Sequence, residues 1–115
     1  MVIGIGVDLV DVARFEEHLA KTPKLLERLF VPAERGASVE SLAGHFAAKE
    51  ALIKALGGSD GVSWQEIEIT KNLSGKPEIK TTDLTAETIA SAGISNLHLS
   101  ISHDGNMAVA MVVAE

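Results

Sequence analysis

The charged side chains best placed to do chemistry lie in the segment 46–58, FAAKEALIKALGG. Glu50 and Lys54 are four residues apart, so on a helix they point from the same side, with roughly 5–6 Å between their Cβ atoms. A carboxylate there can hold a hard cation, and an ammonium one turn further can hold a phosphate bridged by that cation. Taken alone, the same spacing is also typical of an exposed ion pair worth only about 0.2–0.5 kcal/mol. The chemical interpretation therefore needs a second acidic ligand.

Asp8 is a candidate for that second ligand, in the segment 2–12, VIGIGVDLVDV. The alternation predicts a strand on which Gly4, Gly6 and Asp8 share one face. The two glycines leave room beside the carboxylate for a ligand or another backbone. The opposite face is apolar and consists of Ile3, Ile5, Val7 and Leu9. The alternative interpretation is that Asp8 only ends the strand in a turn; the glycine spacing does not match a dinucleotide-binding fingerprint.

The C-terminal segment 97–114 provides a further candidate, His103. Two alternating runs around an Asp-Gly turn predict a hairpin, and His103 ends the apolar face of its first strand. A lone histidine at a strand end is more often a hydrogen-bonded structural residue than a catalyst. The second strand is apolar on both faces, which predicts a central position in the sheet or at a subunit interface.

These candidate residues must be positioned by the strands and helices around them. The chain length and the pattern of those elements predict one α+β domain, residues 1–115, with a mainly antiparallel sheet and helices packed on it. Asp11 is the expected N-cap of a helix that Pro23 kinks or restarts, and Ser38 the cap of a central helix that ends at the Gly57-Gly58 pair. The other expected elements are a loop at 32–40, a hairpin of strands 64–70 and 78–81, and a helix at 84–92 that starts from Asp83 or Thr85 and is stopped by Gly93.

Composition narrows the function classes. The net charge of −6, pI of about 5.1 and aromatic content of 3% argue against a nucleic-acid binder. Because the chain has no cysteine, any metal must be held by oxygen or imidazole, which favours magnesium. No apolar run is long enough for a membrane span and no leader pattern is present, so we expect a cytoplasmic protein with no membrane partner. A hydrophobic content of 46% is high for 115 residues and predicts that apolar surface is buried in an oligomer.

Three basic residues, Arg14, Lys21 and Arg28, are spaced by sevens, with Lys24 nearby. If the helical path continues past Pro23, they form a basic stripe on an acidic protein. Solvated surface is the default interpretation. The alternative is a surface that steers an acidic protein partner.

Three segments together resemble the holo-acyl-carrier-protein synthase group of the 4'-phosphopantetheinyl transferases: GIGVDLVD at 4–11, FAAKEALIK at 46–54 and LSISHD at 99–104. The segments 28–34 and 75–77 are also similar to family segments, so the resemblance covers nearly the whole chain. It implies magnesium-dependent transfer of 4'-phosphopantetheine from coenzyme A to a serine of apo acyl carrier protein. The products are the holo carrier protein, used in fatty acid biosynthesis, and adenosine 3',5'-bisphosphate.

By motif position, the resemblance implies that Asp8 and Glu50 are magnesium ligands, that Lys54 meets the diphosphate and that His103 lies at the coenzyme site. Backbone N–H groups at Gly57 can add phosphate affinity. The family forms homotrimers with shared active sites and docks its acidic carrier protein on the first helix. Under that resemblance the partner-binding residues are Arg14, Lys21 and Arg28.

Two departures from the family pattern concern coenzyme affinity: the 35–45 loop is short, and His45 stands where an arginine often precedes the helix motif. His45 can contribute to phosphate binding when protonated. Spacing leaves the role of Lys49 open between salt bridge and substrate contact. The proton acceptor for the serine is equally open among Asp8, Glu50 and a metal-bound water. Two rival functions are a catalytically silent module that binds coenzyme A or carrier protein, and a purely structural trimer.

Overall fold

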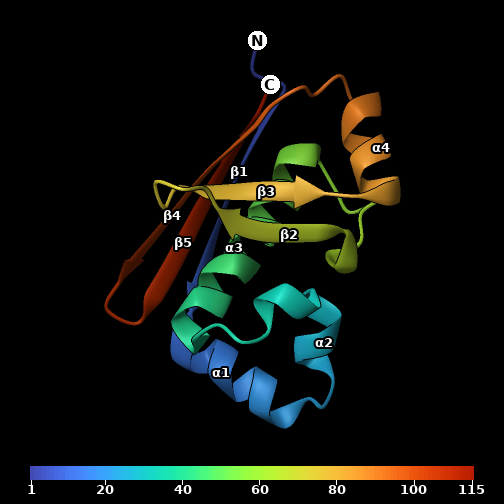
Figure 1. Ribbon diagram of the computed structural model, residues 1–115. Coiled ribbons are helices and arrows are strands. Elements are labelled where there is room, and N and C mark those ends of the chain that lie inside the picture. Colours follow the sequence, from blue (N-terminus) through green and yellow to red (C-terminus); the bar gives the residue numbers. More distant parts are fainter.

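The computed structural model describes residues 1–115 and has the predicted α+β architecture (Figure 1). Five strands and four helices follow one another with two short 3₁₀ turns, at Pro32–Glu34 and Trp64–Glu66. The elements in chain order are β1 (Gly4–Asp11), α1 (Val12–Lys21), α2 (Leu25–Leu29), α3 (Val39–Leu56), β2 (Ile67–Lys71), β3 (Pro77–Thr81), α4 (Asp83–Ser91), β4 (Leu97–Asp104) and β5 (Met107–Ala114).

The strands form two antiparallel sheets. β1, β5 and β4 make a three-stranded sheet in that order, and β2 pairs with β3 in a separate hairpin. The apolar strand β5 therefore lies at the centre of its sheet, as its two apolar faces predict. Helix α3 packs along β1 and β5, α1 and α2 lie at the lower end of the molecule, and β2 and β3 cross in front of α3 (Figure 1).

The core lies on the face of β1 that carries the glycines. Small residues of α3 pack there, including Ala47 and Ala51, which are fully buried. The apolar side chains of β1 point the other way, and the structure leaves Ile5 62% and Leu9 62% exposed. Ile3 just before β1, Val7 of β1 and Met111 of β5 are also exposed. The larger sheet thus has one face against α3, and its other face is exposed and apolar along β1 and at Met111 of β5 but polar along β4.

The basic stripe expected at 14–28 does not follow one helical path. The helix that starts at the predicted N-cap Asp11 ends at Lys21, and Lys24 then adopts a left-handed conformation with φ 70° before α2 begins. Arg14 and Lys21 therefore share α1, while Arg28 lies on α2.

Other boundaries agree closely with the sequence patterns. Ser38 caps α3 by accepting from the Ser41 N–H, and Gly57 ends this helix with φ 86°. The expected strand at 64–70 is wrong at its start, because Trp64–Glu66 forms a 3₁₀ turn and the strand begins at Ile67. None of the helices combines the length and apolar character that a membrane span requires.

Candidate functional site

Two glycines of β1 set the distance between this strand and α3. A Cβ at Gly6 would lie 1.9 Å from the Ala51 carbonyl oxygen, and one at Gly4 would lie 2.0 Å from that of Ala55. Two strand residues advance about 6.8 Å and four helix residues about 6.0 Å, so strand and helix stay in step. The next step brings Asp8 alongside the helical turn that carries Glu50. The sequence predicted space at the two glycines for a ligand or another backbone, and the structure shows that the α3 backbone occupies it.

Asp8 and Glu50 line one hollow, about 260 Å³ in volume, which we call the carboxylate hollow. Lys54 lies at its side, because its Nζ donates to Asp8 Oδ1 (3.1 Å) and to the Val7 carbonyl (3.0 Å). The Lys54 side chain is 55% exposed and so remains accessible to a ligand. The full lining is Asp8, Leu9, Val10, Asp11, Arg14, Phe15, His18, Phe46 and Glu50.

Glu50 is held in an unfavourable electrostatic position. Partial burial raises the pKa of its carboxyl, the nearby Asp8 charge raises it further, and Lys54 opposes both. Glu50 receives no hydrogen bond from any protein group, whereas Asp8 is already paired with Lys54. Two carboxylates that repel each other across a hollow are relieved by a cation placed between them.

The donor set fits magnesium better than a metal that needs many protein ligands. No group of three or more His, Cys, Asp or Glu side chains comes together as a metal cage. Mg²⁺ commonly uses one or two carboxylates and completes its shell with water and substrate phosphates. Asp8 and Glu50 are the two carboxylates in this open hollow that could act as such a pair of oxygen ligands.

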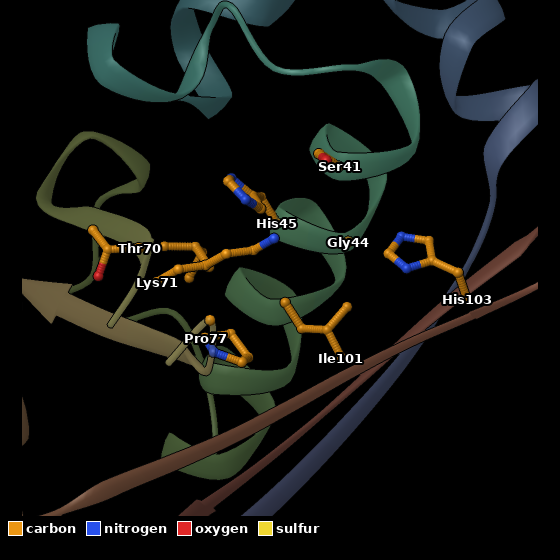
Figure 2. A pocket seen from close by; sticks show the side chains of 10 residues that line it. Ser41, Gly44, His45, Thr70, Lys71, Pro77, Ile101 and His103 are labelled. Carbon is orange, nitrogen blue, oxygen red and sulfur yellow. The ribbon is translucent and has the colours of Figure 1, made fainter. Parts of the chain in front are cut away.

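A second hollow, about 210 Å³ in volume, lies between α3, β2 and β4, and we call it the histidine hollow (Figure 2). His45 and His103 line it from two elements, and Lys71 extends across it toward α3 (Figure 2). Its lining contains no acidic residue, although the protein carries a net charge of −6. The full lining is Ser41, Gly44, His45, Ile69, Thr70, Lys71, Gly75, Pro77, Ile101 and His103. This composition suits an anion.

Both histidines are held by one ring nitrogen. His45 Nδ1 donates to the Glu34 carboxylate (2.9 Å), and His103 Nε2 donates to the Glu40 carbonyl (2.9 Å), since both partners can only accept. The absence of a side chain at Gly44 lets His103 lie close to α3, because a Cβ there would be 3.2 Å from Nε2. The other nitrogen of each ring has no hydrogen-bond partner in the protein.

Lys49 has a structural role, which settles the question that its spacing left open. The side chain is fully buried, and its Nζ donates to Glu34 Oε1 (2.7 Å), the Leu29 carbonyl (2.8 Å) and the Trp64 carbonyl (3.3 Å). It also lies over the Phe30 ring, 5.2 Å from the centroid. Lys49 therefore ties α3 to α2 and to the turn before β2 rather than contacting substrate.

The predicted site residues fall into separate regions of this chain. Asp8, Glu50 and Arg14 meet at the carboxylate hollow, with Lys54 beside it, whereas the two histidines lie at the histidine hollow. Gly57 lines a third, smaller depression. The exposed Lys21 and Arg28 line none of these hollows.

Lys71 is the residue of the histidine hollow that the sequence reasoning missed. Lys71 follows the buried Ile67 and Ile69 on the same face of β2. A charged residue at the end of a buried strand face was the sequence signal that could have marked it as a candidate.

Comparison with known proteins gives a consistent result over the whole chain. The family model of the 4'-phosphopantetheinyl transferase superfamily matches residues 4–112. The holo-[acyl-carrier-protein] synthase of Clavibacter michiganensis is 51% identical over 115 residues, which is 100% of this chain and 97% of that protein. The same enzyme from Leifsonia xyli is also 51% identical and is covered to 98%.

Solved structures agree with these relatives. The crystal structure of holo-[acyl-carrier-protein] synthase from Neisseria meningitidis superposes with a TM-score of 0.91 at 34% identity, covering 100% of this chain and 99% of that chain. The Helicobacter pylori enzyme, solved in complex with coenzyme A, gives a TM-score of 0.84 at 37% identity, covering 96% and 99%.

Proposed function

Since this chain belongs to the 4'-phosphopantetheinyl transferase superfamily, we propose how its own residues carry out the family reaction. The protein transfers 4'-phosphopantetheine from coenzyme A to a serine of apo acyl carrier protein, giving the holo carrier protein and adenosine 3',5'-bisphosphate. A cytoplasmic location is part of the proposal. The observation that carries the site assignment is the pair of opposed carboxylates with Lys54 at their side.

Asp8 and Glu50 are the residues that would hold Mg²⁺. When bound, the ion would neutralise charge on the diphosphate and help to orient it. Lys54 supplies the protein's own positive charge at the same place, and its exposure lets the ammonium leave Asp8 for a phosphate oxygen. A serine oxygen that attacks phosphorus meets negative oxygens on every side, so positioning and charge neutralisation are what these side chains contribute.

The histidine hollow supplies a second anion-binding surface for coenzyme A. His45, His103 and Lys71 bring nitrogen donors to a lining that has no carboxylate. Each hollow is smaller than the roughly 300–1,000 Å³ typical of small-molecule sites. We therefore assign the two hollows to one coenzyme site in which the histidine hollow of one copy meets the carboxylate hollow of the next.

The exposed apolar strip of β1 and β5 supports an oligomer, and we propose a homotrimer. Ile5, Val7 and Leu9 are 62%, 56% and 62% exposed on β1, and Met111 is 47% exposed on the neighbouring β5. A contiguous apolar strip of this kind is typical of a subunit interface. Sedimentation equilibrium of the wild type and of Val7→Lys tests the assignment, with a trimer expected only for the wild type.

The surface of α1 next to the carboxylate hollow is the proposed docking site for acyl carrier protein. Arg14 lines the hollow and shares α1 with Lys21. Arg28 lies on α2, so it contacts the carrier protein only if that partner also reaches α2. Arg14→Glu is expected to raise KM for the carrier protein well above any change in coenzyme A affinity; equal losses in both would remove Arg14 from the docking surface.

The function itself is tested by intact-mass spectrometry of an apo acyl carrier protein incubated with this protein and coenzyme A. A mass gain of one phosphopantetheine in Mg²⁺, and none with chelator, is the expected result. Modification that is unaffected by chelator would exclude the metal assignment. The absence of any gain with several apo carriers would favour the silent binding module, and coenzyme A affinity would then test that module.

Complementation between inactive variants tests the shared site. Asp8→Ala removes a carboxylate-hollow residue and His103→Ala a histidine-hollow residue, so each pure variant is expected to have little activity. After the two are unfolded together and refolded, mixed oligomers should regain part of the wild-type turnover, because some interfaces then combine two intact hollows. If verified mixed oligomers recover no activity, the two hollows of one copy act together and the shared site is wrong.

A further inference from the structure

The buried carboxylate of Glu34 contacts both walls of the histidine hollow. Its Oε2 accepts from His45 Nδ1 on α3 (2.9 Å) and from the Ile69 backbone N–H on β2 (3.3 Å). Its Oε1 accepts from Lys49 (2.7 Å) and from the Val31 N–H (3.1 Å). One side chain therefore joins the helix that carries His45 to the strand that continues into Lys71.

Glu34 can occupy this place only because Lys49 accompanies it. The Glu34 side chain is 1% exposed and that of Lys49 is 0% exposed, so each supplies the other's counter-charge inside the core. Burial raises the pKa of the Glu34 carboxyl, but the hydrogen bonds from His45 and Lys49 and the Lys49 charge outweigh burial, and the pKa lies below its ordinary value. The carboxylate thus stays ionised beside His45.

The contact also fixes which nitrogen of His45 remains without a hydrogen-bond partner in the protein. A carboxylate oxygen only accepts, so Nδ1 carries the proton in this hydrogen bond and Nε2 is the nitrogen left for a ligand. When the ring carries both protons, Nε2–H can donate to a phosphate oxygen. The His45 side chain is 18% exposed, and without the contact to Glu34 its ring could rotate about its χ angles and turn Nε2 elsewhere.

We propose that Glu34 is a positioning residue for coenzyme A, holding the imidazole of His45 so that Nε2 faces the coenzyme phosphates and anchoring β2 on the opposite wall. The inference rests on the proposed coenzyme role of the histidine hollow. It adds a buried residue that touches no substrate and that acts through His45.

A thermodynamic cycle tests the proposal. Glu34→Gln alone would strand the buried Lys49 charge, so the pair is removed together as E34Q/K49M, which leaves no net buried charge. Coenzyme A affinity is measured calorimetrically for the wild type, E34Q/K49M, H45Q and the triple variant. We expect H45Q to weaken binding about tenfold, as for loss of a hydrogen bond to a charged group. E34Q/K49M should weaken binding about fivefold when His45 is present and less than twofold when it is absent.

The outcomes separate the proposal from its premise. If E34Q/K49M weakens binding equally with and without His45, Glu34 is only structural and the proposal is wrong, while the coenzyme role of His45 stands. If H45Q leaves affinity unchanged, the coenzyme role of His45 fails first. H98Q is the matched control, because His98 is bound to Glu115 on the distant end of β4 and should not affect affinity. At saturating coenzyme A, kcat of E34Q/K49M should change less than twofold.

A measurement on the wild type does not depend on any variant folding. Long-range ¹H–¹⁵N correlation of the neutral imidazoles should show the Nδ1–H tautomer for His45, as its bond to Glu34 requires. His98 is an internal control with the opposite expectation, since its Nε2 contacts the Glu115 carboxylate (2.6 Å). An Nε2–H tautomer at His45 would overturn the proposal.

Discussion

Helix α3 carries two lysines, five positions apart, that each pair with a carboxylate and yet have opposite roles. Lys49 is fully buried against Glu34, with an Nζ to Oε1 distance of 2.7 Å. Lys54 is 55% exposed and contacts Asp8 at 3.1 Å. The buried pair has no access to a ligand and links α3 to its neighbours. The exposed pair borders a hollow, and in the proposed function Lys54 exchanges Asp8 for a phosphate.

The difference shows that burial decides which lysine of the motif has a structural role and which is accessible to a ligand. A buried ion pair is costly to break, because the remaining charge has neither water nor partner. An exposed pair contributes little to stability, since water screens both charges, so its groups are free to bind substrate. Within the segment 46–54, we therefore expect the residues with the largest effect on folding to differ from those with the largest effect on turnover.

The largest effect is expected for Lys49→Ala. This change leaves the Glu34 carboxylate buried without its main counter-charge, and we expect the free energy of unfolding to fall by about 3–5 kcal/mol. Urea denaturation followed by circular dichroism measures the loss. Lys49→Met together with Glu34→Gln should recover most of it, and a Lys49→Ala variant as stable as the wild type would contradict the buried pair.

Lys54→Ala should have the reverse profile. Turnover is expected to fall about 10²–10³-fold, as when one charge-stabilising group is lost from a transition state. The free energy of unfolding should change by no more than about 0.2–1 kcal/mol, because the pair is exposed. Steady-state kinetics and urea denaturation are measured on the same preparation, with Lys80→Ala, an exposed lysine on β3, as control. Destabilisation comparable to Lys49→Ala would erase the contrast between the two lysines.

Glu50→Gln is expected to lose activity while gaining a little stability. Burial and Asp8 raise the pKa of Glu50, so the folded state binds its proton more tightly than the unfolded state does. Stability is then lost as pH rises through the folded pKa, and an uncharged Gln removes that cost. We expect Glu50→Gln to be inactive and, without metal, more stable at pH 7 by less than about 1 kcal/mol.

Mg²⁺ provides the control for this variant. Thermal denaturation with and without the ion should show stabilisation of the wild type and much less of Glu50→Gln, because only the wild type has both of the proposed carboxylate ligands. An equal response of both proteins would mean that Glu50 is not a ligand.

The smallest expected effect is a difference in acid sensitivity. The pKa of Glu34 lies below its ordinary value of 4.5, so its contribution to stability is present above pH 4.5 and is lost as pH falls through the folded pKa. Urea denaturation at pH 7, 5 and 3.5 should therefore show a shallower loss for E34Q/K49M than for the wild type. Identical slopes would indicate that the buried pair does not contribute to acid unfolding.

The sequence by itself determined most of the elements, and it indicated which residues to consider for chemistry. Alternation at 2–12 and 97–114, the caps Asp11 and Ser38, and the glycine at position 57 are local signals, because backbone conformation there depends on nearby residues. For the two carboxylates and Lys54, spacing alone left an exposed ion pair as the simpler interpretation, and the family resemblance supplied their roles, which stay predictions.

Only the tertiary structure decided which face of β1 is buried and which lysine is structural. The alternation at 2–12 marks an apolar face, but the core formed on the glycine face because only there can the α3 backbone approach within contact distance of the strand. Likewise, Lys49 and Lys54 have the same chemistry and lie on one helix. Their roles depend on burial by α2 and the turn before β2, contacts between residues 15 to 20 positions apart that no local pattern encodes.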